Sequence, residues 1–518
     1  MTDDQYKIAT NELNGRLHVP YQRSGVQWLL KQENIASGPR GGFLCDEMGL
    51  GKTIQLIATM LGNKKQKTLL IVPKSIIIQW AAEIKRFAPA IGVHIFEGPK
   101  RALTSAQESW ILNPERPSVV IASYNVLGKK NEEPGMKTAI HYLKWDRIIL
   151  DEAHEIRNKH SKSFKNACLL RAEIKWIVTG TPVFNYVQDF QSLCKFLGTD
   201  DKVDFVHEMY VLRRTKADLA DDNERLRLPP CDFENVEIEM YDEERSLYQF
   251  AHAEASEVMR QENVMGSKNM EIIEHLMRMR QCMIWPQVYL NNVAKKKGID
   301  PQRWTGRSKK METLFRLIDE HPREKSLVFC QHIAEMDYIQ GELSESYDGY
   351  DSDDLMGCGL NPDPDAVERR SKRTAVATRD VFRIDGSVSK EDRDRFVEEF
   401  RASPPGSILI LQIKAGGVGL NLQEATRVYI TTPSWNPATE LQALGRSHRT
   451  GQTQCVHVKK LIYRGFPGFA SVEEAIVMLQ GRKSDVCATV LKDPRIKTQI
   501  PVGRKVSRIS LMKNIFDA

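Results

Sequence analysis

The chain has 518 residues and a formal net charge of +6; 41% of its residues are hydrophobic and 27% are charged. This composition is ordinary for a folded globular protein, so it excludes a fibrous or wholly disordered chain, and the length allows about three to four domains. We expect no membrane span and no signal peptide, because no apolar run reaches roughly 18 residues and the first residues lack a basic start and an apolar core.

Strand-like apolar runs alternate with helical stretches up to about residue 200. These runs cover residues 43–45, 68–72, 118–122, 147–150 and 176–179. A second set covers residues 326–329, 407–411, 427–430 and 456–458. Short apolar runs separated by helices are typical of buried strands in a parallel sheet. Residues 236–295 lie between the two sets and have a helical pattern, so the sequence predicts two α/β lobes joined by a helical insert.

A glycine-containing loop follows the first apolar run and leads into a helical pattern at residues 54–61. Its eight residues are Asp46, Glu47, Met48, Gly49, Leu50, Gly51, Lys52 and Thr53. The glycines allow backbone N–H groups to turn toward an anion at a helix N-terminus. Lys52 supplies a charge for nucleotide phosphates, and the Thr53 hydroxyl suits Mg²⁺. Because Asp46 stands where the generic phosphate loop has Gly, a coincidental turn remains the alternative at this point.

Two carboxylates, Asp151 and Glu152, come directly after the strand-like run at 147–150, and Ala153 and His154 follow them. The carboxyl end of a buried strand is where ligands bind in open α/β sheets. Phosphate hydrolysis needs a magnesium ligand, for which Asp151 is suited, and a group that orients the attacking water, for which Glu152 is suited. A helix N-terminus with acidic residues is the alternative interpretation. A further turn, residues 179–182, also follows a strand and offers small hydroxyl side chains.

An acidic segment interrupts the second set of strands. Residues 345–365 hold seven acidic residues and neither Lys nor Arg. Basic residues follow directly, namely Arg369, Arg370, Lys372 and Arg373. Low hydrophobicity and dense like charge predict a disordered acidic loop over residues 345–373. The basic cluster is compatible with a nuclear-import signal, with a contact to a DNA backbone, or with the solvated end of a loop.

Two motifs lie in the second half of the chain. The first, residues 415–422, has three glycines in four positions, Gly416, Gly417 and Gly419, which indicates close backbone approach to a ligand or to the other lobe. The second, residues 442–452, contains Arg446 and Arg449, which would share one face if this stretch is helical. Two guanidinium groups on one face can stabilise the charge of a transferring phosphoryl group, and a solvated basic helix is the alternative.

Taken together and in order, these motifs resemble the helicase-like ATPases of superfamily two, and more narrowly the SWI/SNF-type chromatin-remodelling and DNA-repair translocases. The residues that carry the resemblance are 20–22, 46–53, 71–73, 151–154, 179–182, 327–331, 415–422 and 442–452. Both the Asp-Glu-x-Gly-x-Gly-Lys-Thr loop and the Gln-Ala-x-x-Arg-x-x-Arg-x-Gly-Gln ending belong to that group. The match spans about residues 15–485.

The resemblance implies an architecture of two RecA-like parallel-sheet lobes with helical insertions between and on them. We expect the first, ATP-binding lobe over residues 1–225 and a helical insert and linker over 226–300. A second lobe of the helicase C-terminal type would cover 301–485 and include the acidic loop, with a basic tail over 486–518. The implied activity is a DNA-stimulated ATPase that moves along double-stranded DNA, in chromatin remodelling or DNA repair.

The resemblance also implies roles for single residues. Gln22 would contact the adenine, and Lys52 and Thr53 would hold the phosphates and Mg²⁺ together with Asp151. Glu152 would act on the attacking water, and Arg446 and Arg449 would reach the nucleotide from the second lobe. Further nucleotide-binding positions are the rest of the loop from Asp46 to Thr53, Gly417, Gly419 and Gln442.

Several further motifs indicate which branch of the family the chain resembles and which partners to expect. Residues 212–216 resemble the segment that leaves the first lobe in this family, and residues 276–286 resemble a stretch of its DNA-repair branch. That branch often carries a RING finger. We expect no zinc module here, because the nine cysteines include no C-x-x-C pair. Phe184 replaces a common Gln after the 179–182 turn, while Asn185 remains. Double-stranded DNA is the expected partner, with nucleosomes or DNA-bound proteins as further candidates, and the location is nuclear if the host is eukaryotic.

Two other functions are alternatives to this one. An RNA-dependent helicase of the same superfamily is disfavoured by the 415–422 and 442–452 signatures, and ATPase stimulation by duplex DNA or by RNA would discriminate the two. An inactive scaffold that binds DNA and partners is disfavoured because every nucleotide-site side chain is present.

Deleting residues 345–365 is expected to leave DNA-stimulated ATPase activity within about a few-fold of the full chain, because long surface loops carry a small entropic cost and tolerate deletion. ATPase rates and thermal melting of the two proteins, measured side by side, check this. A collapse of activity or solubility would contradict the prediction and indicate that the acidic segment packs against a lobe.

Overall fold

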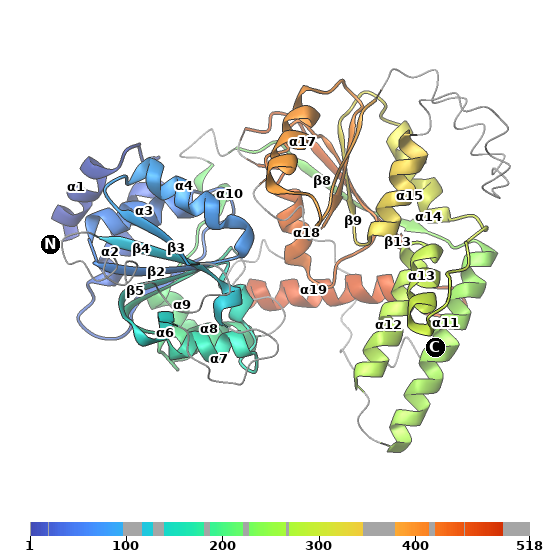
Figure 1. The fold of residues 1–518 in the computed structure, drawn as a ribbon, viewed down its shortest axis with the longest axis horizontal. Helices are drawn as coiled ribbons and strands as arrows, with labels where there is room; N and C mark the ends of the chain where they lie inside the picture. The colour runs from blue at the N-terminus through green and yellow to red at the C-terminus, as the bar shows by residue number, and fades with distance from the viewer. Residues whose placement is uncertain are drawn as a thin grey trace. The chain divides into compact units, whose positions relative to one another are not determined.

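The computed structural model describes residues 2–18, 20–96, 117–127, 139–180, 187–220, 227–265, 269–344, 379–413, 420–449 and 451–490. The chain divides between Arg227 and Leu228 into two compact units, each built on a parallel sheet (Figure 1). Residues 485–490 group with the first unit. Within the described helices, none is long and apolar enough to span a membrane.

The first unit contains a seven-stranded sheet in the order β3-β4-β2-β5-β6-β1-β7, and all of its strand pairs are parallel. Its strands are β1 (Arg40–Leu44), β2 (Lys67–Val72), β3 (Gly92–Phe96), β4 (Ser118–Ser123), β5 (Lys144–Asp151), β6 (Arg171–Val178) and β7 (Val211–Leu212). Because the strands are parallel, the carboxyl ends of β5, β6, β1 and β7 lie next to one another at one edge of the sheet.

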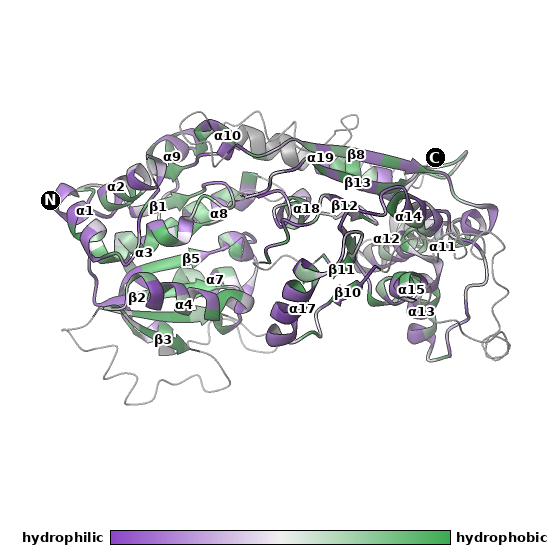
Figure 2. Ribbon diagram, turned by 90° about the horizontal axis from the view of Figure 1, so that it is seen from above, coloured by the Kyte–Doolittle hydropathy of each residue, from purple (hydrophilic) through white to green (hydrophobic). Residues whose placement is uncertain are grey.

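Helices cover both faces of this sheet (Figure 1). One face packs against α1 (Thr2–Glu12), α2 (Tyr21–Glu33), α3 (Lys52–Gly62) and α4 (Ile77–Phe87). The other packs against α6 (Ala139–Tyr142), α7 (Lys162–Leu169), α8 (Val187–Leu197) and α9 (Val203–Tyr210). Successive residues of a strand point to opposite faces, so Leu69 and Ile71 join the second core while Leu70 and Val72 join the first. Stretches of the central strands therefore read as apolar runs, such as residues 69–72 of β2 and 148–150 of β5. Figure 2 shows both strands as mostly hydrophobic.

The second unit contains a six-stranded parallel sheet in the order β10-β11-β9-β12-β13-β8. Its strands are β8 (Cys231–Ile238), β9 (Ser326–Cys330), β10 (Val381–Ile384), β11 (Ile408–Gln412), β12 (Arg427–Ile430) and β13 (Val456–Tyr463). One face packs against α11 (Asp242–Met265), α12 (Asn269–Ile284), α13 (Pro286–Lys297), α14 (Lys309–Asp319), α15 (Ile333–Ser344) and α19 (Val472–Val490). The other packs against α17 (Lys390–Ala402) and α18 (Pro437–Leu444).

The predicted fold class is confirmed, since all nine expected strand runs lie in one of the two parallel sheets. The boundaries predicted after residues 225, 300 and 485 stay predictions. The segment expected as a helical insert, 226–300, also contributes the strand β8, and its helices α11 to α13 share a core with the second sheet. The acidic loop and the basic cluster at 369–373 lie outside the described residues.

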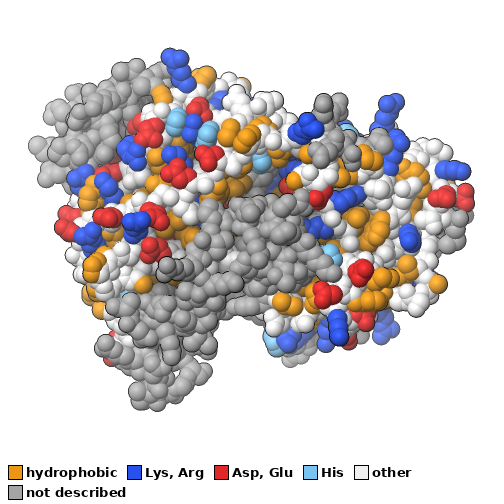
Figure 3. All heavy atoms as spheres, turned by 180° about the vertical axis from the view of Figure 1, so that it is seen from behind, with side chains coloured by type: hydrophobic (Ala, Val, Ile, Leu, Met, Phe, Trp, Pro, Cys, Tyr) orange, Lys and Arg blue, Asp and Glu red, His pale blue; other side chains and the backbone are white. Residues whose placement is uncertain are grey.

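Charged side chains of both signs are interspersed over the described surface of the face in Figure 3. The net charge of +6 is therefore not gathered into one basic field on the described part of that face. Helix α17 is mostly hydrophilic (Figure 2); its residues Val397 and Phe400 are buried in the core, and Phe396 packs against it partly buried.

Candidate active site

The loop between β1 and α3 has the backbone that a phosphate-binding loop requires. Gly49 has φ 91° and Gly51 has φ 75°, both in the left-handed region that glycine adopts without strain. Helix α3 begins at Lys52, immediately after Gly51. The free N–H groups of a helix N-terminus favour an anion in front of them. Thr53 lies half-buried in the first turn of α3; in the loop Met48 is half-buried and Gly49 is exposed.

The Lys52 ammonium lies over the loop itself, because its Nζ donates to the backbone oxygens of Asp46 at 2.8 Å and Glu47 at 3.4 Å. Gly180 follows β6 and packs against one side of the phosphate loop. A Cβ added at Gly180 would lie 3.5 Å from Met48 Cγ and 3.9 Å from Lys52 Nζ. The Thr179–Gly180 turn therefore abuts the phosphate loop, as far as the described residues extend. Thr181, Pro182 and Phe184 lie outside them.

Leu50 and Gln22 fix the loop from the side of α2. Leu50 is fully buried in a small cluster with Tyr21 of α2 and Leu219 of α10 (Lys216–Leu219). The Gln22 amide donates to Leu50 O at 3.2 Å, and its oxygen accepts from His18 N at 2.8 Å. Both ends of this amide are thus bonded within the protein, and the adenine contact expected for Gln22 stays a prediction.

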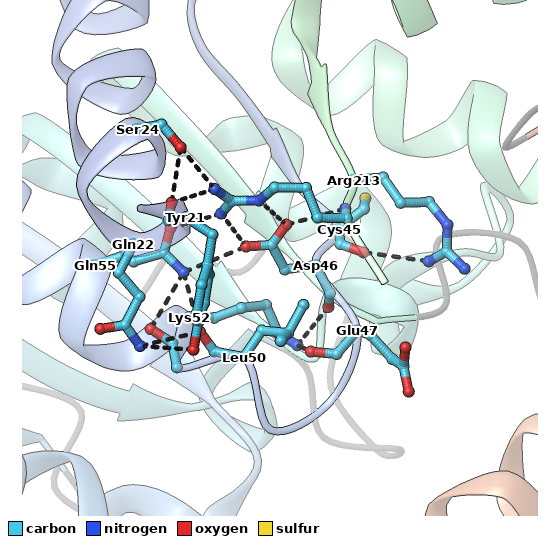
Figure 4. Close-up of polar contacts among 12 residues, drawn as sticks. Tyr21, Gln22, Ser24, Cys45, Asp46, Glu47, Leu50, Lys52, Gln55 and Arg213 are labelled. Atoms are coloured by element: carbon cyan, nitrogen blue, oxygen red, sulfur yellow. Dashed lines mark hydrogen bonds and ion pairs between the residues drawn. The ribbon is translucent and has the colours of Figure 1, made fainter. Parts of the chain in front are cut away.

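The first two residues of the loop bond to the segment that follows β7. Figure 4 shows the polar contacts of the Asp46 carboxylate. The Asp46 carboxylate is fully buried, and Arg214 and Gln55 donate to it. Glu47 accepts from the Lys216 backbone N–H at 2.8 Å and forms an ion pair with its ammonium at 3.6 Å. We expected both acidic residues at the nucleotide. Their side chains engage the chain that leaves the first sheet, and the nucleotide contacts expected of them stay predictions. Sequence reasoning did not identify the partners Arg214 and Gln55.

Asp151 ends β5, so it stands at the same sheet edge as the phosphate loop. Its Oδ2 accepts from Trp80 Nε1 at 2.7 Å and its Oδ1 from the Glu152 N–H at 2.9 Å. Burial, and next the charge of Glu152, raise the pKa of Asp151 to about 6, while the Trp80 hydrogen bond and the charge of Lys52 lower it. Trp80 was not identified from the sequence, because nothing in α4 marks it as a partner of β5.

Glu152 is the one non-glycine residue with positive φ among the described residues, at φ 50° and ψ 47°. A side chain in this conformation is strained, and such strain concentrates at functional sites. The Glu152 carboxylate lies 3.2 Å from His154 Nδ1 and is half-buried. The backbone thus turns at Glu152, directly after the strand that Asp151 ends, and the two carboxylates have different partners, Trp80 for Asp151 and His154 for Glu152.

The residues at this edge fit Mg²⁺ bound mainly through nucleotide phosphates. Mg²⁺ usually binds through one or two carboxylates plus substrate phosphates rather than in a cage made by the protein. Among the described residues, no group of three or more His, Cys, Asp and Glu side chains gathers to hold a metal ion. The raised pKa of Asp151 indicates a carboxylate whose negative charge a nearby cation would stabilise. Asp151 and Thr53 are the residues that would hold the ion.

Replacing Trp80 with Phe is expected to raise the Mg²⁺ concentration needed for half-maximal ATPase activity about 10-fold or more, the range for removal of a group that orients a metal ligand. Phe keeps an aromatic ring but loses part of the indole together with the 2.7 Å hydrogen bond to Asp151, so the packing loss must be controlled for. Trp176→Phe is the matched control, since Trp176 is buried and donates to the Glu33 carboxylate at 2.9 Å. Equal Mg²⁺ dependence in the two variants would contradict the role given to Trp80.

The predicted arginine motif lies in the second unit, and its backbone corrects one expectation. We expected Arg446 and Arg449 on one face of a helix, but α18 ends at Leu444, and both arginines lie in the turns that follow. Helix α18 begins at Pro437, after the capping residue Asn436, and it ends at Leu444, before Gly445. It is therefore only eight residues long. Gln442 lies on α18 and is half-buried.

The turns that carry the arginines are bonded to the segment before β12. Leu422 N donates to Arg446 O at 3.0 Å, and Gln452 Nε2 donates to Gln423 O at 2.8 Å. Arg446 is buried, whereas Arg449 is half-buried and donates to Leu420 O at 3.4 Å. Gly417 and Gly419 lie outside the described residues, so their assignment stays a prediction. The pair of arginines is thus held by tertiary contacts rather than by helical spacing.

Comparison with known proteins gives matches along most of the chain. A family model for the SNF2-related domain matches residues 21–207 and 201–288, and one for the helicase conserved C-terminal domain matches residues 309–451. YwqA of Bacillus subtilis, named as a candidate ATP-dependent helicase/translocase, is 31% identical over 90% of this chain and 48% of its own length. The DNA repair protein RAD5 of Yarrowia lipolytica is 26% identical over 89% of this chain and 56% of its own.

The chain is also similar to a chromatin-remodelling ATPase and to a solved ATPase core. The ISWI chromatin-remodeling complex ATPase ISW1 of Saccharomyces cerevisiae is 26% identical over 99% of this chain and 44% of its own length. The solved SWI2/SNF2 ATPase core of Sulfolobus solfataricus in complex with dsDNA aligns with 95% of this chain and 98% of its own at 24% identity, with a TM-score of 0.38. The chain spans about half the length of the three curated relatives.

The two parallel sheets and the phosphate loop define an α/β nucleotide-binding protein of two units. The family matches make the assignment specific. The chain belongs to the SNF2-related, helicase-like ATPases, a family of ATP-hydrolysing enzymes, which confirms the resemblance predicted from its motifs.

Proposed function

We propose that this chain is a DNA-stimulated ATPase that moves along double-stranded DNA. The observation that carries the proposal is the edge of the first sheet where the phosphate loop with Lys52 follows β1 and the Asp151–Glu152 pair follows β5, with the parallel strand β6 between them. A phosphate loop and a pair of carboxylates with different surroundings are what ATP hydrolysis requires.

Each residue has a distinct task in this proposal. The N–H groups of the loop and the Lys52 ammonium bind the ATP phosphates, and Asp151 and Thr53 hold Mg²⁺, which would offset charge on the phosphate oxygens. Glu152, which directly follows the strand, orients the attacking water and accepts its proton. Arg446 and Arg449 of the second unit are proposed to stabilise the charge of the transferring phosphoryl group.

Double-stranded DNA is the nucleic acid along which the chain is proposed to move, because relatives of this chain are named for chromatin remodelling and DNA repair. Contacts with the DNA backbone would be largely independent of sequence and would weaken as the salt concentration rises. Remodelling of nucleosomes, displacement of DNA-bound proteins and translocation in repair all fit this activity. A nuclear location stays a prediction that depends on a eukaryotic host.

ATPase rates without nucleic acid, with duplex DNA and with RNA test the proposal directly. We expect strong stimulation by duplex DNA and a stimulation that declines with salt. Stimulation by RNA alone would favour the RNA-dependent helicase, and DNA binding without any hydrolysis would favour the inactive scaffold. Displacement of a labelled third strand from duplex DNA then separates movement along DNA from mere stimulation of hydrolysis.

A further inference from the structure

We infer that Arg214 is a positioning residue for the phosphate loop and that it sets the affinity of the loop for nucleotide. This inference rests on the proposed function, because it concerns the same site. Arg214 lies in the short segment after β7, far in sequence from the loop that it contacts, and the mechanism above does not use it.

One guanidinium group joins three elements of the first unit. Arg214 Nε donates to Asp46 Oδ1 at 3.0 Å, and a terminal nitrogen donates to Asp46 Oδ2, which forms a two-pronged pair with the loop. The same guanidinium donates to the Tyr21 carbonyl and, at 3.3 Å, to Ser24 Oγ of α2. It also donates to Gln55 Oε1 of α3 at 2.8 Å. Planar, forked donation of this kind is specific to arginine.

Asp46 is fully occupied by protein donors. Oδ1 accepts from the backbone N–H of Arg214 at 3.1 Å and from its Nε, and Oδ2 accepts from the guanidinium and from Gln55 Nε2 at 3.2 Å. A carboxylate offers about four lone-pair positions, and these four donors use them. We therefore assign Asp46 to shaping the loop rather than to contact with the nucleotide.

The backbone around Arg214 continues the pairing of β1 and β7 into the loop. Cys45 N donates to Leu212 O at 2.7 Å, and Glu47 N donates to Arg214 O at 2.9 Å, so the two segments run side by side. Gly25 of α2 packs against this contact, because a Cβ added there would lie 1.9 Å from Gln55 Oε1 and 2.7 Å from an Arg214 nitrogen. The loop, α2 and α3 are thus closely packed around one arginine side chain, which is 14% exposed.

Charge explains why this contact affects nucleotide binding. Asp46 places a buried negative charge at the start of a loop that must accept polyphosphate, and its pair with Arg214 neutralises that charge. Without Arg214, Asp46 would repel the phosphates in a poorly screened environment and would release the loop from α2. Nucleotide affinity should therefore fall even where the chain remains folded.

The test is equilibrium binding of a fluorescent ATP analogue, together with thermal melting without nucleotide. Arg214→Lys keeps the charge and loses the fork, and we expect it to raise Kd about 10-fold. Arg214→Gln should raise Kd further. The double variant Asp46→Asn, Arg214→Gln removes both charges, so its Kd should return toward the wild-type value relative to Arg214→Gln alone.

Arg427→Lys is the matched control. Arg427 lies in the second unit and forms the same forked pair with Glu324, at 2.8 Å and 2.9 Å. It should lower Tm without changing Kd. Wild-type Kd in Arg214→Lys, with a Tm loss like that of Arg427→Lys, would overturn the inference and leave Arg214 a purely structural residue. A double variant that binds no better than Arg214→Gln would also overturn the charge argument. If the wild type fails to bind the analogue, the proposed function fails instead.

Discussion

Lys52→Ala is expected to abolish ATP hydrolysis, because Lys52 is the only cationic side chain in the loop from Asp46 to Thr53. The ammonium bonds only to backbone oxygens of its own loop among the contacts described, at 2.8 Å and 3.4 Å, so it can turn to phosphate without breaking an ion pair. ATPase rates with duplex DNA and binding of a fluorescent ATP analogue are the measurements. Both should fall, since the charge acts on bound ATP and in the transition state.

Glu152→Gln should give a different result, and the contrast defines the two roles. Gln keeps the size of the side chain and leaves Asp151 in place, so ATP should still bind. Turnover should fall by about 10²-fold or more, the range for loss of a general base. Asp151 continues to be oriented by Trp80 and by the backbone of residue 152. Turnover near the wild-type rate in either variant would remove the role assigned to that residue.

The strands that sequence reasoning missed share one physical property. They are β3, β7, β8 and β10, and each is an outer strand of its sheet. Central strands are buried on both faces over much of their length, and those stretches, such as residues 148–150 of β5, read as apolar runs that the sequence displays directly. An outer strand such as β8 carries exposed acidic residues, among them Asp232 and Glu234, so its pattern is hard to distinguish from a loop.

In the site, too, the sequence predicts the local motifs but not their distant partners. The phosphate loop and the Asp151–Glu152 pair are local patterns that follow strands, so the sequence predicts where they lie. The partners that orient them are distant in the chain, since Trp80 is 71 residues from Asp151 and Arg214 is 168 residues from Asp46. No periodicity or spacing encodes such pairs. They arise only when parallel strands bring separate segments to one edge of the sheet.

The arginine pair illustrates the same limit within a single motif. Spacing of three residues suggested one helical face, but Gly445 and the contacts to residues 420–425 end α18 first. The position of each guanidinium is therefore set by tertiary contacts. Burial, and next the charge of Arg401, lower the pKa of Arg449, which places two cationic groups in one region of the second unit. Arg401 also forms ion pairs with Glu398 at 3.4 Å and Glu424 at 3.5 Å, which balance part of this positive charge within the second unit.

Arg449→Ala is expected to spare binding of both ATP and duplex DNA and to remove the DNA-stimulated part of hydrolysis. Lys52 and Arg449 belong to different units, so the proposed mechanism requires the second unit to close over the first for Arg449 to act on ATP. An interaction delivered by closure stabilises the transition state more than the bound substrate. Arginine fingers in phosphoryl transfer contribute roughly 10³ to 10⁵ in rate, so the loss should be large. Single-turnover and steady-state ATPase rates with duplex DNA measure it.

Two further variants make this result specific to the Arg449 guanidinium. Arg449→Lys should rescue poorly, because Lys lacks the planar fork that can contact two phosphate oxygens. Arg401→Ala removes the neighbouring positive charge, which bonds to Asn421 O at 2.9 Å, and should leave the stimulated rate within about a few-fold. If Arg449→Ala hydrolyses ATP normally with DNA present, hydrolysis does not depend on closure of the two units. The arginine turns of the second unit would then serve only to hold residues 420–425 in place.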